Sequence, residues 1–128
     1  MGKRRAPTPT QRSLALLRRE GFVAAGVERR LPRCGVTVDA FGLFDLLAVR
    51  ADVRGVVGVQ ATSGTNHAGR VRKLLGTATL STRLAAGNRA EVWSWTKRRR
   101  RRTCRRQRLD AADLGGAGAA ARTGGDSA

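Results

Sequence analysis

Apolar positions in the first part of the chain repeat with the spacing of an amphipathic helix. Leu14 and Leu17 are three positions apart, within a polar stretch that ends before a glycine. This pattern predicts a helix that is capped at its start by Thr10 or Ser13 and runs to about Glu20. The helix would lay its apolar stripe on whatever sheet follows.

Shorter segments with β-branched and aromatic residues follow this helix, and their patterns are typical of strands. We expect strands over residues 22–31, 44–50, 55–62 and 90–96, and helices over residues 67–75 and 79–86. Because helical sequence separates the third and fourth strands, these two can lie parallel through a right-handed crossover. The order α-β-β-β-α-β therefore predicts a single α/β domain with a mixed four-stranded sheet.

The second and third strands predict a hairpin with a definite register. If Arg50 pairs with Gly55, Asp45 lies opposite Gln60, with Cβ atoms about 5 Å apart. Carboxylate and amide oxygens can both bind Mg²⁺, so this pair is a candidate metal site, and Asp39 in the preceding loop could add a carboxylate. The alternative is a buried polar pair whose members satisfy each other, because a lone Asp among apolar residues is costly.

The charge of the chain favours a polyanionic partner, and DNA is the expected one. The 128 residues carry a net charge of +17, and residues 10–96 alone carry 13 basic and six acidic residues. An alternative stays open, because Arg, Ala, Gly and Val are all abundant, which is also what a compositional bias would produce. The chain could then be a structural partner protein whose charge has no role.

The charge also divides the chain into three parts. Residues 1–9 form a basic N-terminal segment that is expected to be flexible, and residues 10–97 form the folded domain. Residues 98–128 form a tail that is expected to be disordered, because like charges repel and Ala and Gly bury little surface. Lys97, Arg98, Arg99 and Arg100 are candidate phosphate-binding residues. The sequence shows no signal peptide and no apolar span, so a cytoplasmic protein is expected.

The segment that leads into the middle helix is a second candidate phosphate site. Small polar residues precede a helix start, whose free N–H groups attract phosphate, and two basic residues share one face of that helix. The candidates are Ser63, Asn66, Arg70 and Lys73. The alternative is a solvated basic face.

Two other residue types are ambiguous from the sequence. His67 is the only histidine, and a capping or surface role is expected for it rather than general-base catalysis. Trp93 and Trp95 alternate on the last strand and share one face, which favours core packing over base stacking.

Six segments together resemble a known family. They cover residues 8–12, 27–29, 39–45, 59–64, 66–73 and 86–93. Their order and residues are similar to the PD-(D/E)XK nuclease superfamily, and in particular to small phage and bacterial Holliday-junction-resolvase-like proteins. The resemblance implies a restriction-endonuclease-like fold, Mg²⁺-dependent hydrolysis of DNA and a homodimer, in a bacterial or phage-infected cell.

Within that resemblance two catalytic positions differ from the family pattern. Asp45 matches the metal-binding Asp, Gln60 stands where the family has Glu or Asp, and Thr62 stands where it has Lys. Thr cannot stabilise developing negative charge as Lys does, so the resemblance implies that Lys73 or Arg70 on the following helix takes this role. The alternative is a DNA-binding accessory protein without catalysis.

Glu20 on the first helix matches, in the same resemblance, the extra acidic ligand that some members of the superfamily use.

Overall fold

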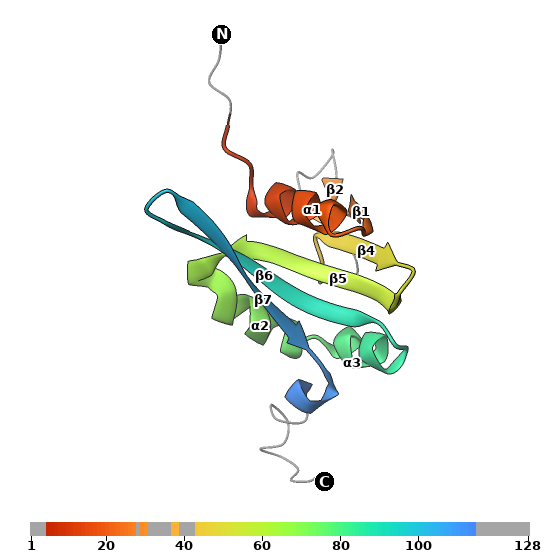
Figure 1. The fold of residues 1–128 in the computed structure, drawn as a ribbon. Helices are drawn as coiled ribbons and strands as arrows, with labels where there is room; N and C mark the ends of the chain where they lie inside the picture. The colour runs from red at the N-terminus through yellow and green to blue at the C-terminus, as the bar shows by residue number, and fades with distance from the viewer. Residues whose placement is uncertain (1–4, 28, 31–36, 39–42, 115–128) are drawn as a thin grey trace.

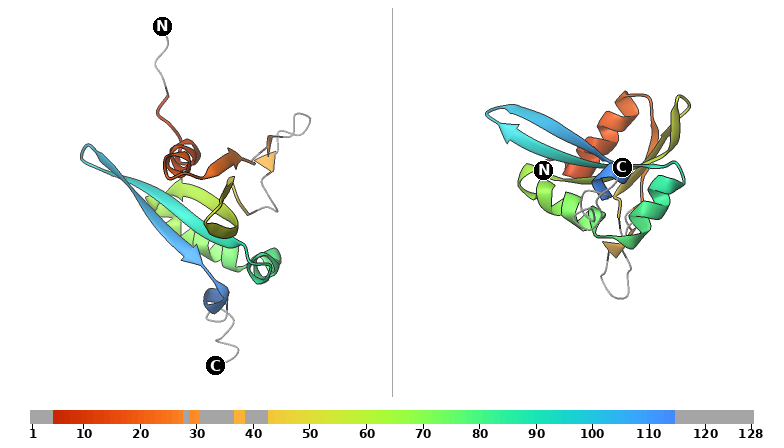
Figure 2. Two further views of the ribbon diagram at one scale, coloured as in Figure 1. Left: turned by 45° about the vertical axis from the view of Figure 1, so that its right-hand side comes forward. Right: turned by 90° about the horizontal axis from the view of Figure 1, so that it is seen from below.

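The computed structural model describes residues 5–27, 29–30, 37–38 and 43–114 as an α/β domain built on a five-stranded mixed sheet. Helix α1 covers one face of the sheet, and α2 and α3 cover the other (Figures 1 and 2). In chain order the elements are α1 (Pro9–Arg19), β1 (Val23–Gly26), β2 (Arg29–Arg30), β3 (Thr37–Val38), β4 (Leu46–Arg50), β5 (Val53–Ser63), the 3₁₀ turn η1 (Gly64–Asn66), α2 (His67–Leu75), α3 (Ala78–Ala85), β6 (Arg89–Arg98) and β7 (Arg101–Leu109).

The sheet has the strand order β1-β4-β5-β6-β7. The pairs β1–β4, β4–β5 and β6–β7 are antiparallel, whereas β5 and β6 run parallel. The chain crosses from β5 to β6 through α2 and α3. The predicted α/β class, the mixed sheet and the parallel crossover are thus confirmed, while the predicted strand count is wrong by one.

Helix α1 is capped two residues earlier than the sequence indicated. Thr8 caps it: the Thr8 hydroxyl accepts from the Gln11 N–H, and the Gln11 side chain accepts from the Thr8 N–H, with Pro9 in the first turn. This reciprocal arrangement satisfies two otherwise free backbone donors. Ser13, one of the two predicted caps, is instead buried on the face of the helix that meets the sheet.

The first predicted strand is shorter than expected. Strand β1 ends at Gly26, and the next residue, Val27, donates its N–H to the carbonyl oxygen of Asp45. Beyond it, β2 and β3 form a separate two-stranded sheet. The predicted strand over residues 22–31 is therefore two short strands that belong to different sheets.

Apolar side chains fill both sides of the main sheet. On the α1 side, Leu17 and Trp93 pack with strand residues of β4 and β5; on the other side, Phe44 and Leu74 pack with residues of α3, β6 and β7. Burying each of the larger side chains contributes roughly 1.5–3 kcal/mol. Gly58 leaves room for Phe44, because a Cβ there would lie 2.6 Å from the ring.

Strand β7 corrects the prediction that the basic tail carries no packed structure. Nine basic residues lie between Lys97 and Arg108, yet Arg101–Leu109 pairs with β6 along its whole length. Leu109 is buried in the core beneath the sheet. A helical turn over residues 111–114 follows, with the Asp110 carboxylate accepting from backbone N–H groups. The remainder of the predicted tail, residues 115–128, lies outside the described residues.

The charge of β7 is offset where the strand crosses α1. Both guanidinium NH groups of Arg106 donate to the Glu20 carboxylate at 2.6 and 2.9 Å, and the same guanidinium lies 4.0 Å from the centre of the Trp93 ring. Hydrogen bonding by Arg106 lowers the pKa of Glu20, and Glu20 in turn raises the pKa of Arg106. This pair links α1 to β7 across 86 positions of sequence, a distance that no local pattern reveals.

We expect the Glu20–Arg106 pair to make stability depend on pH. Because the pKa of Glu20 is lowered in the folded state, its contribution is complete above the ordinary glutamate pKa of about 4.3 and is lost as the pH falls through the folded-state value. Arg106→Gln should cost about 1 kcal/mol of unfolding free energy near neutral pH, since both groups are about one-third exposed. In urea titrations this cost should shrink as the pH falls below the ordinary glutamate pKa, whereas Arg105→Gln should show no such trend.

Among the residues that the structure describes, no helix is both long enough and apolar enough to cross a membrane.

Candidate functional site

The predicted register brings Asp45 and Gln60 together. Leu46 pairs with Val59 and Leu47 with Gly58, so Asp45 and Gln60 are the next opposed positions, and the Asp45 N–H donates to the Val59 carbonyl. Asp45 is 5% exposed and Gln60 is 2% exposed. The two side chains thus form a buried polar pair on the α2–α3 face of the sheet, as Val59 points to the α1 face and successive residues alternate.

The hydrogen bonds of this pair are unequal. Asp45 Oδ2 accepts from the Ala61 N–H at 2.8 Å and from Gln60 Nε2 at 3.2 Å. Gln60 Oε1 is buried and has no hydrogen-bond partner within the described part of the chain. An unsatisfied buried acceptor costs about 1–3 kcal/mol, so a bound cation would give the amide oxygen of Gln60 the partner that it lacks.

The donor chemistry of the pair fits Mg²⁺. The ion takes oxygen ligands, keeps several waters and is often held by only one or two protein side chains together with substrate phosphates. Here, however, the amide nitrogen of Gln60 faces the carboxylate. For both side chains to bind one ion, the amide must turn so that Oε1 replaces Nε2, and the Asp45–Gln60 hydrogen bond is then lost.

The other acidic candidates do not join this pair in the described structure. Glu20 pairs with Arg106 on the α1 side of the sheet, so its predicted role as an extra ligand is wrong. Asp39 lies outside the described residues. Among those that are described, no three His, Cys, Asp or Glu side chains gather as a metal-binding group.

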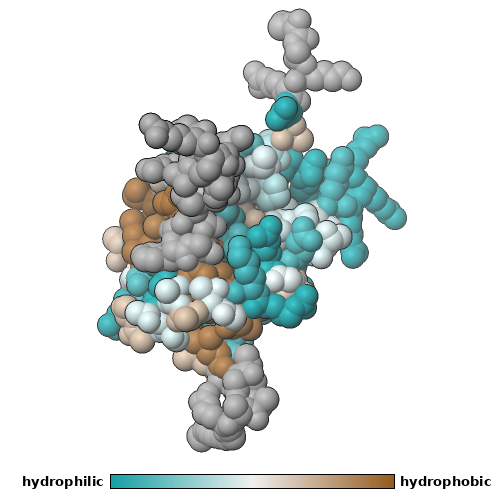
Figure 3. All heavy atoms as spheres, turned by 180° about the vertical axis from the view of Figure 1, so that it is seen from behind, coloured by the Kyte–Doolittle hydropathy of each residue, from teal (hydrophilic) through white to brown (hydrophobic). Residues whose placement is uncertain are grey.

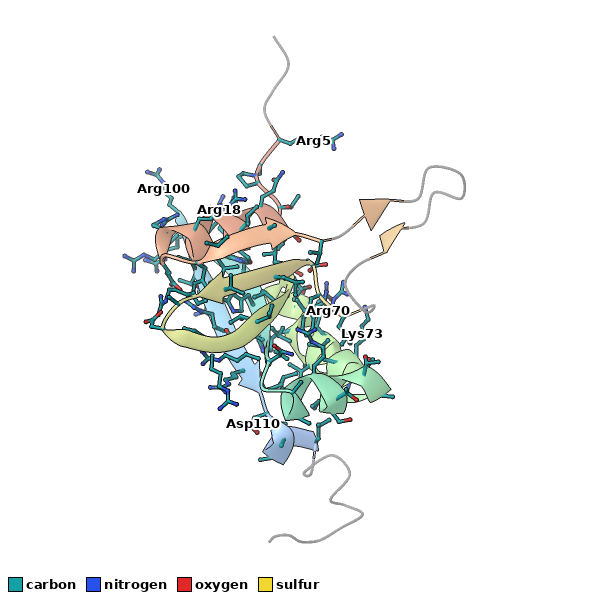
Figure 4. The ribbon with its side chains drawn as sticks, turned by 90° about the vertical axis from the view of Figure 1, so that its right-hand side faces the viewer. Arg5, Arg18, Arg70, Lys73, Arg100 and Asp110 are labelled. Carbon is teal, nitrogen blue, oxygen red and sulfur yellow. The ribbon has the colours of Figure 1, made fainter. Side chains whose placement is uncertain are left out.

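The residue that the resemblance sets at a lysine position is buried. Thr62 is 5% exposed and pairs with Ser94 of β6 in the parallel register. It has no charge to offer a phosphate. The basic candidates on the following helix are Arg70 and Lys73. They lie three positions apart and project from the same side of α2 (Figure 4).

The turn before α2 is more compact than a plain loop. Ser63 Oγ lies 3.2 Å from Thr65 Oγ1 and accepts from Asn66 Nδ2 at 3.2 Å. Gly64 packs against Thr96 of β6, where a Cβ would clash with the hydroxyl oxygen. Ser63 and Asn66 thus use their side chains to hold the turn, and Asn66 occupies the cap position without a capping hydrogen bond.

His67 is a buried structural residue. Its Nε2 lies 2.8 Å from Gln107 Oε1, which can only accept, and its Nδ1 lies 2.7 Å from Ser94 Oγ. The Nε2 atom therefore carries the proton in this bond. His67 is 3% exposed, so the expected capping or surface role is wrong: it ties the start of α2 to both β6 and β7.

The two tryptophans, which the sequence placed together, have different surroundings. Trp93 is fully buried, and its Nε1 donates to Glu91 at 2.8 Å. Trp95 is half-buried and its Nε1 donates to Ser13 Oγ at 2.9 Å. Core packing is confirmed for Trp93. Trp95 lies on the same face of β6 but is only half-buried.

Beyond Trp95 the β6–β7 hairpin leaves the body of the domain. Figures 1 and 2 show its tip extending past α1 and α2, and Figure 3 shows the same tip as a hydrophilic projection. We call residues 97–102 the arm. All six are basic and exposed: Lys97, Arg98, Arg99, Arg100, Arg101 and Arg102. Arg100 lies in the turn at its tip.

Cys104 faces the α1 side at the base of the arm. Burial raises the pKa of its thiol to about 11, which makes it a poor nucleophile at neutral pH. It has no disulfide partner in the described chain.

Comparisons of the chain with protein-family models, with curated proteins and with solved structures find no match.

Proposed function

We propose that the chain is a DNA-binding protein with a nuclease-like domain. The observation that supports this most is the arm: six consecutive basic residues held on an ordered two-stranded ribbon that extends from the sheet. A disordered basic tail would lose conformational entropy on binding, whereas this ribbon is already ordered before it binds. A two-stranded β-ribbon is also of the size that the major groove of DNA admits.

The arrangement of the charge supports the same function. Outside the arm, Arg105 and Arg108 on β7 are exposed. Arg106 alone of the β7 arginines is ion-paired within the described residues. Cationic side chains that have no carboxylate partner keep their full attraction for phosphate, so binding should release counterions and weaken steeply with salt.

Cleavage of DNA is a second candidate, and the orphaned Oε1 of Gln60 beside Asp45 favours it. Bound Mg²⁺ would supply a Lewis acid for the phosphoryl oxygen and an activated water. Asp45 and Gln60 would hold the ion, and Arg70 or Lys73 would stabilise charge on the phosphate. The resemblance to PD-(D/E)XK nucleases, including Holliday-junction-resolvase-like proteins, supports the same assignment.

A catalytically inactive DNA-binding protein is favoured by two other observations. Thr62 supplies no positive charge, and the amide of Gln60 already donates to Asp45. On this alternative Asp45 and Gln60 are a buried polar pair that has only a structural role.

Binding is tested by fluorescence anisotropy with labelled duplex and four-way-junction DNA over a range of salt concentrations. We expect binding that weakens linearly in log affinity against log salt, with a slope near −0.9 for each phosphate neutralised. Absence of binding at low salt would exclude the proposed function.

Cleavage is tested on junction, flap and linear DNA with Mg²⁺ or Mn²⁺, comparing the wild type with Asp45→Asn and Gln60→Glu. Asn keeps an acceptor for the Ala61 N–H but loses the charge, so metal-dependent cleavage should disappear. Glu restores a second carboxylate and should lower the metal concentration required. Equal cleavage by wild type and Asp45→Asn would remove the pair from the mechanism, and no cleavage by any variant would leave binding as the function.

A further inference from the structure

A groove of about 520 Å³ lies between α1 and the β6–β7 hairpin, on the face of the sheet away from Asp45 and Gln60. Trp95, Leu16 and Ala15 give it apolar surface. Its charged lining comes from three arginines, Arg12, Arg19 and Arg102, and none of the described residues that line it is acidic. The groove thus combines an aromatic side chain with positive charge only.

Helix α1 presents its share of this lining as one stripe. Arg12, Leu16 and Arg19 follow one another at spacings of four and three residues, so they share a face of the helix. Arg102 approaches from the arm on the other side, opposite Lys97 in the hairpin register. Positive charge therefore borders the groove from two separate elements.

Trp95 is held in place within the groove. Its indole N–H donates to the hydroxyl of Ser13, which is fully buried in α1. The ring therefore presents carbon surface to the groove and no unsatisfied donor. Trp95 also lines a second hollow of about 420 Å³, together with Thr65 and Lys97, so the ring lies where the two hollows meet.

We propose that this groove binds single-stranded DNA, with an unpaired base stacked on Trp95 and the flanking phosphates bound by the three arginines. This binding mode rests on the proposed DNA binding and narrows it to strands with unpaired bases. Stacking on an aromatic side chain beside basic residues is how single strands are bound without sequence preference. The second hollow gives the strand a path from Trp95 toward Lys97.

Duplex DNA cannot bind the groove in the same way as a single strand. In paired DNA the faces of the bases are covered by their neighbours, and only their edges are open in the grooves. Trp95 can stack only on a base that has left the helix. The arm serves both forms of DNA, because phosphate contacts need no unpaired base.

The test measures affinity for an oligothymidylate of about 10 nucleotides and for a duplex, by anisotropy at one salt concentration. Trp95→Ala should weaken single-strand binding about 10- to 100-fold and change duplex binding little. Arg12→Gln should weaken single-strand binding more than Arg72→Gln does. Arg72 is the matched control, an exposed arginine on α2, across the sheet from the groove.

A fluorescence measurement separates stacking from a loss of structure. The chain has two tryptophans, and Trp93 is fully buried, so quenching by a stacked base must come from Trp95. Trp95→Phe keeps an aromatic face and should retain single-strand affinity within about three-fold, yet the quenching should vanish.

Two results would overturn the proposal, and they are distinguishable. If the wild type binds duplex and single strand but Trp95→Ala binds the single strand equally well, the groove is not the site and DNA binding stands. If the wild type binds neither form at low salt, the proposed function fails, and the groove assignment fails with it.

Discussion

Trp93→Ala should lower the free energy of unfolding by about 3–5 kcal/mol, the usual cost of truncating a buried aromatic residue to alanine. Trp93 is fully buried against Leu17 and apolar residues of β4 and β5. Truncation also removes the ring under the Arg106 guanidinium and the hydrogen bond to Glu91. Since small domains are stable by only about 5–15 kcal/mol, the variant should be close to unfolding at room temperature.

The matched control for this prediction is Trp95→Ala, two positions along the same strand face. Trp95 is half-buried and lies at the groove, so its removal leaves little enclosed cavity and should cost about half as much or less. Urea denaturation followed by circular dichroism measures both. Equal losses from the two substitutions would show that Trp93 is not the centre of the α1-side core.

Replacing all five arginines of the arm, Arg98–Arg102, by glutamine should lower duplex affinity about 10²- to 10³-fold at roughly 0.1 M salt, if the arm binds phosphate as proposed. Each phosphate contact that is lost also removes about 0.9 from the slope of log affinity against log salt. The slope is the more informative measurement, because a misfolded variant would lose affinity without this proportional change.

The control for the arm compares two double variants with the same change of charge. Arg99→Gln with Arg100→Gln alters the tip of the hairpin, and Arg54→Gln with Arg72→Gln alters two exposed arginines elsewhere on the domain. The tip variant should lose clearly more affinity. Similar losses in both would mean that net charge, rather than the arm, determines binding.

The sequence predicted the centre of the fold well because its pattern there is local. The β4–β5 hairpin has apolar strands and a short connection, and the register that places Asp45 opposite Gln60 is correct at Leu46, Leu47 and Ala48. The error lies at the turn, where Arg50 pairs with Val53 instead of Gly55 because the register shifts after Ala48. An irregularity of this kind has no clear sequence signal.

Strand β7 was missed for a different reason. Its turn consists of Arg99 and Arg100, without the Gly, Asn or Asp that usually marks a two-residue hairpin turn, and Arg99 has a φ of 56°. Its stabilising partners, Glu20 and His67, are far away in sequence. A run of arginines is typical of a solvated tail, and Thr103 alone among residues 98–108 is β-branched.

The sequence predicted that Asp45 and Gln60 form a pair, but it did not predict how their side chains are hydrogen-bonded. The sequence could place Asp45 beside Gln60, whereas the direction of the Gln60 amide and the orphaned Oε1 depend on the Ala61 N–H and on packing around both side chains. The sequence alone could not predict the groove, because its lining combines α1 with Trp95 and Arg102 of the β6–β7 hairpin, which are far away in sequence.

Strand β7 has one further consequence, because it is the outer strand of the sheet. An open edge offers unpaired N–H and C=O groups to another copy of the chain, and natural proteins discourage this pairing with charged side chains. Five arginines lie along β7. Two such edges would repel each other strongly, so without a polyanion between them, copies of this domain should not join through β7, even at high concentration.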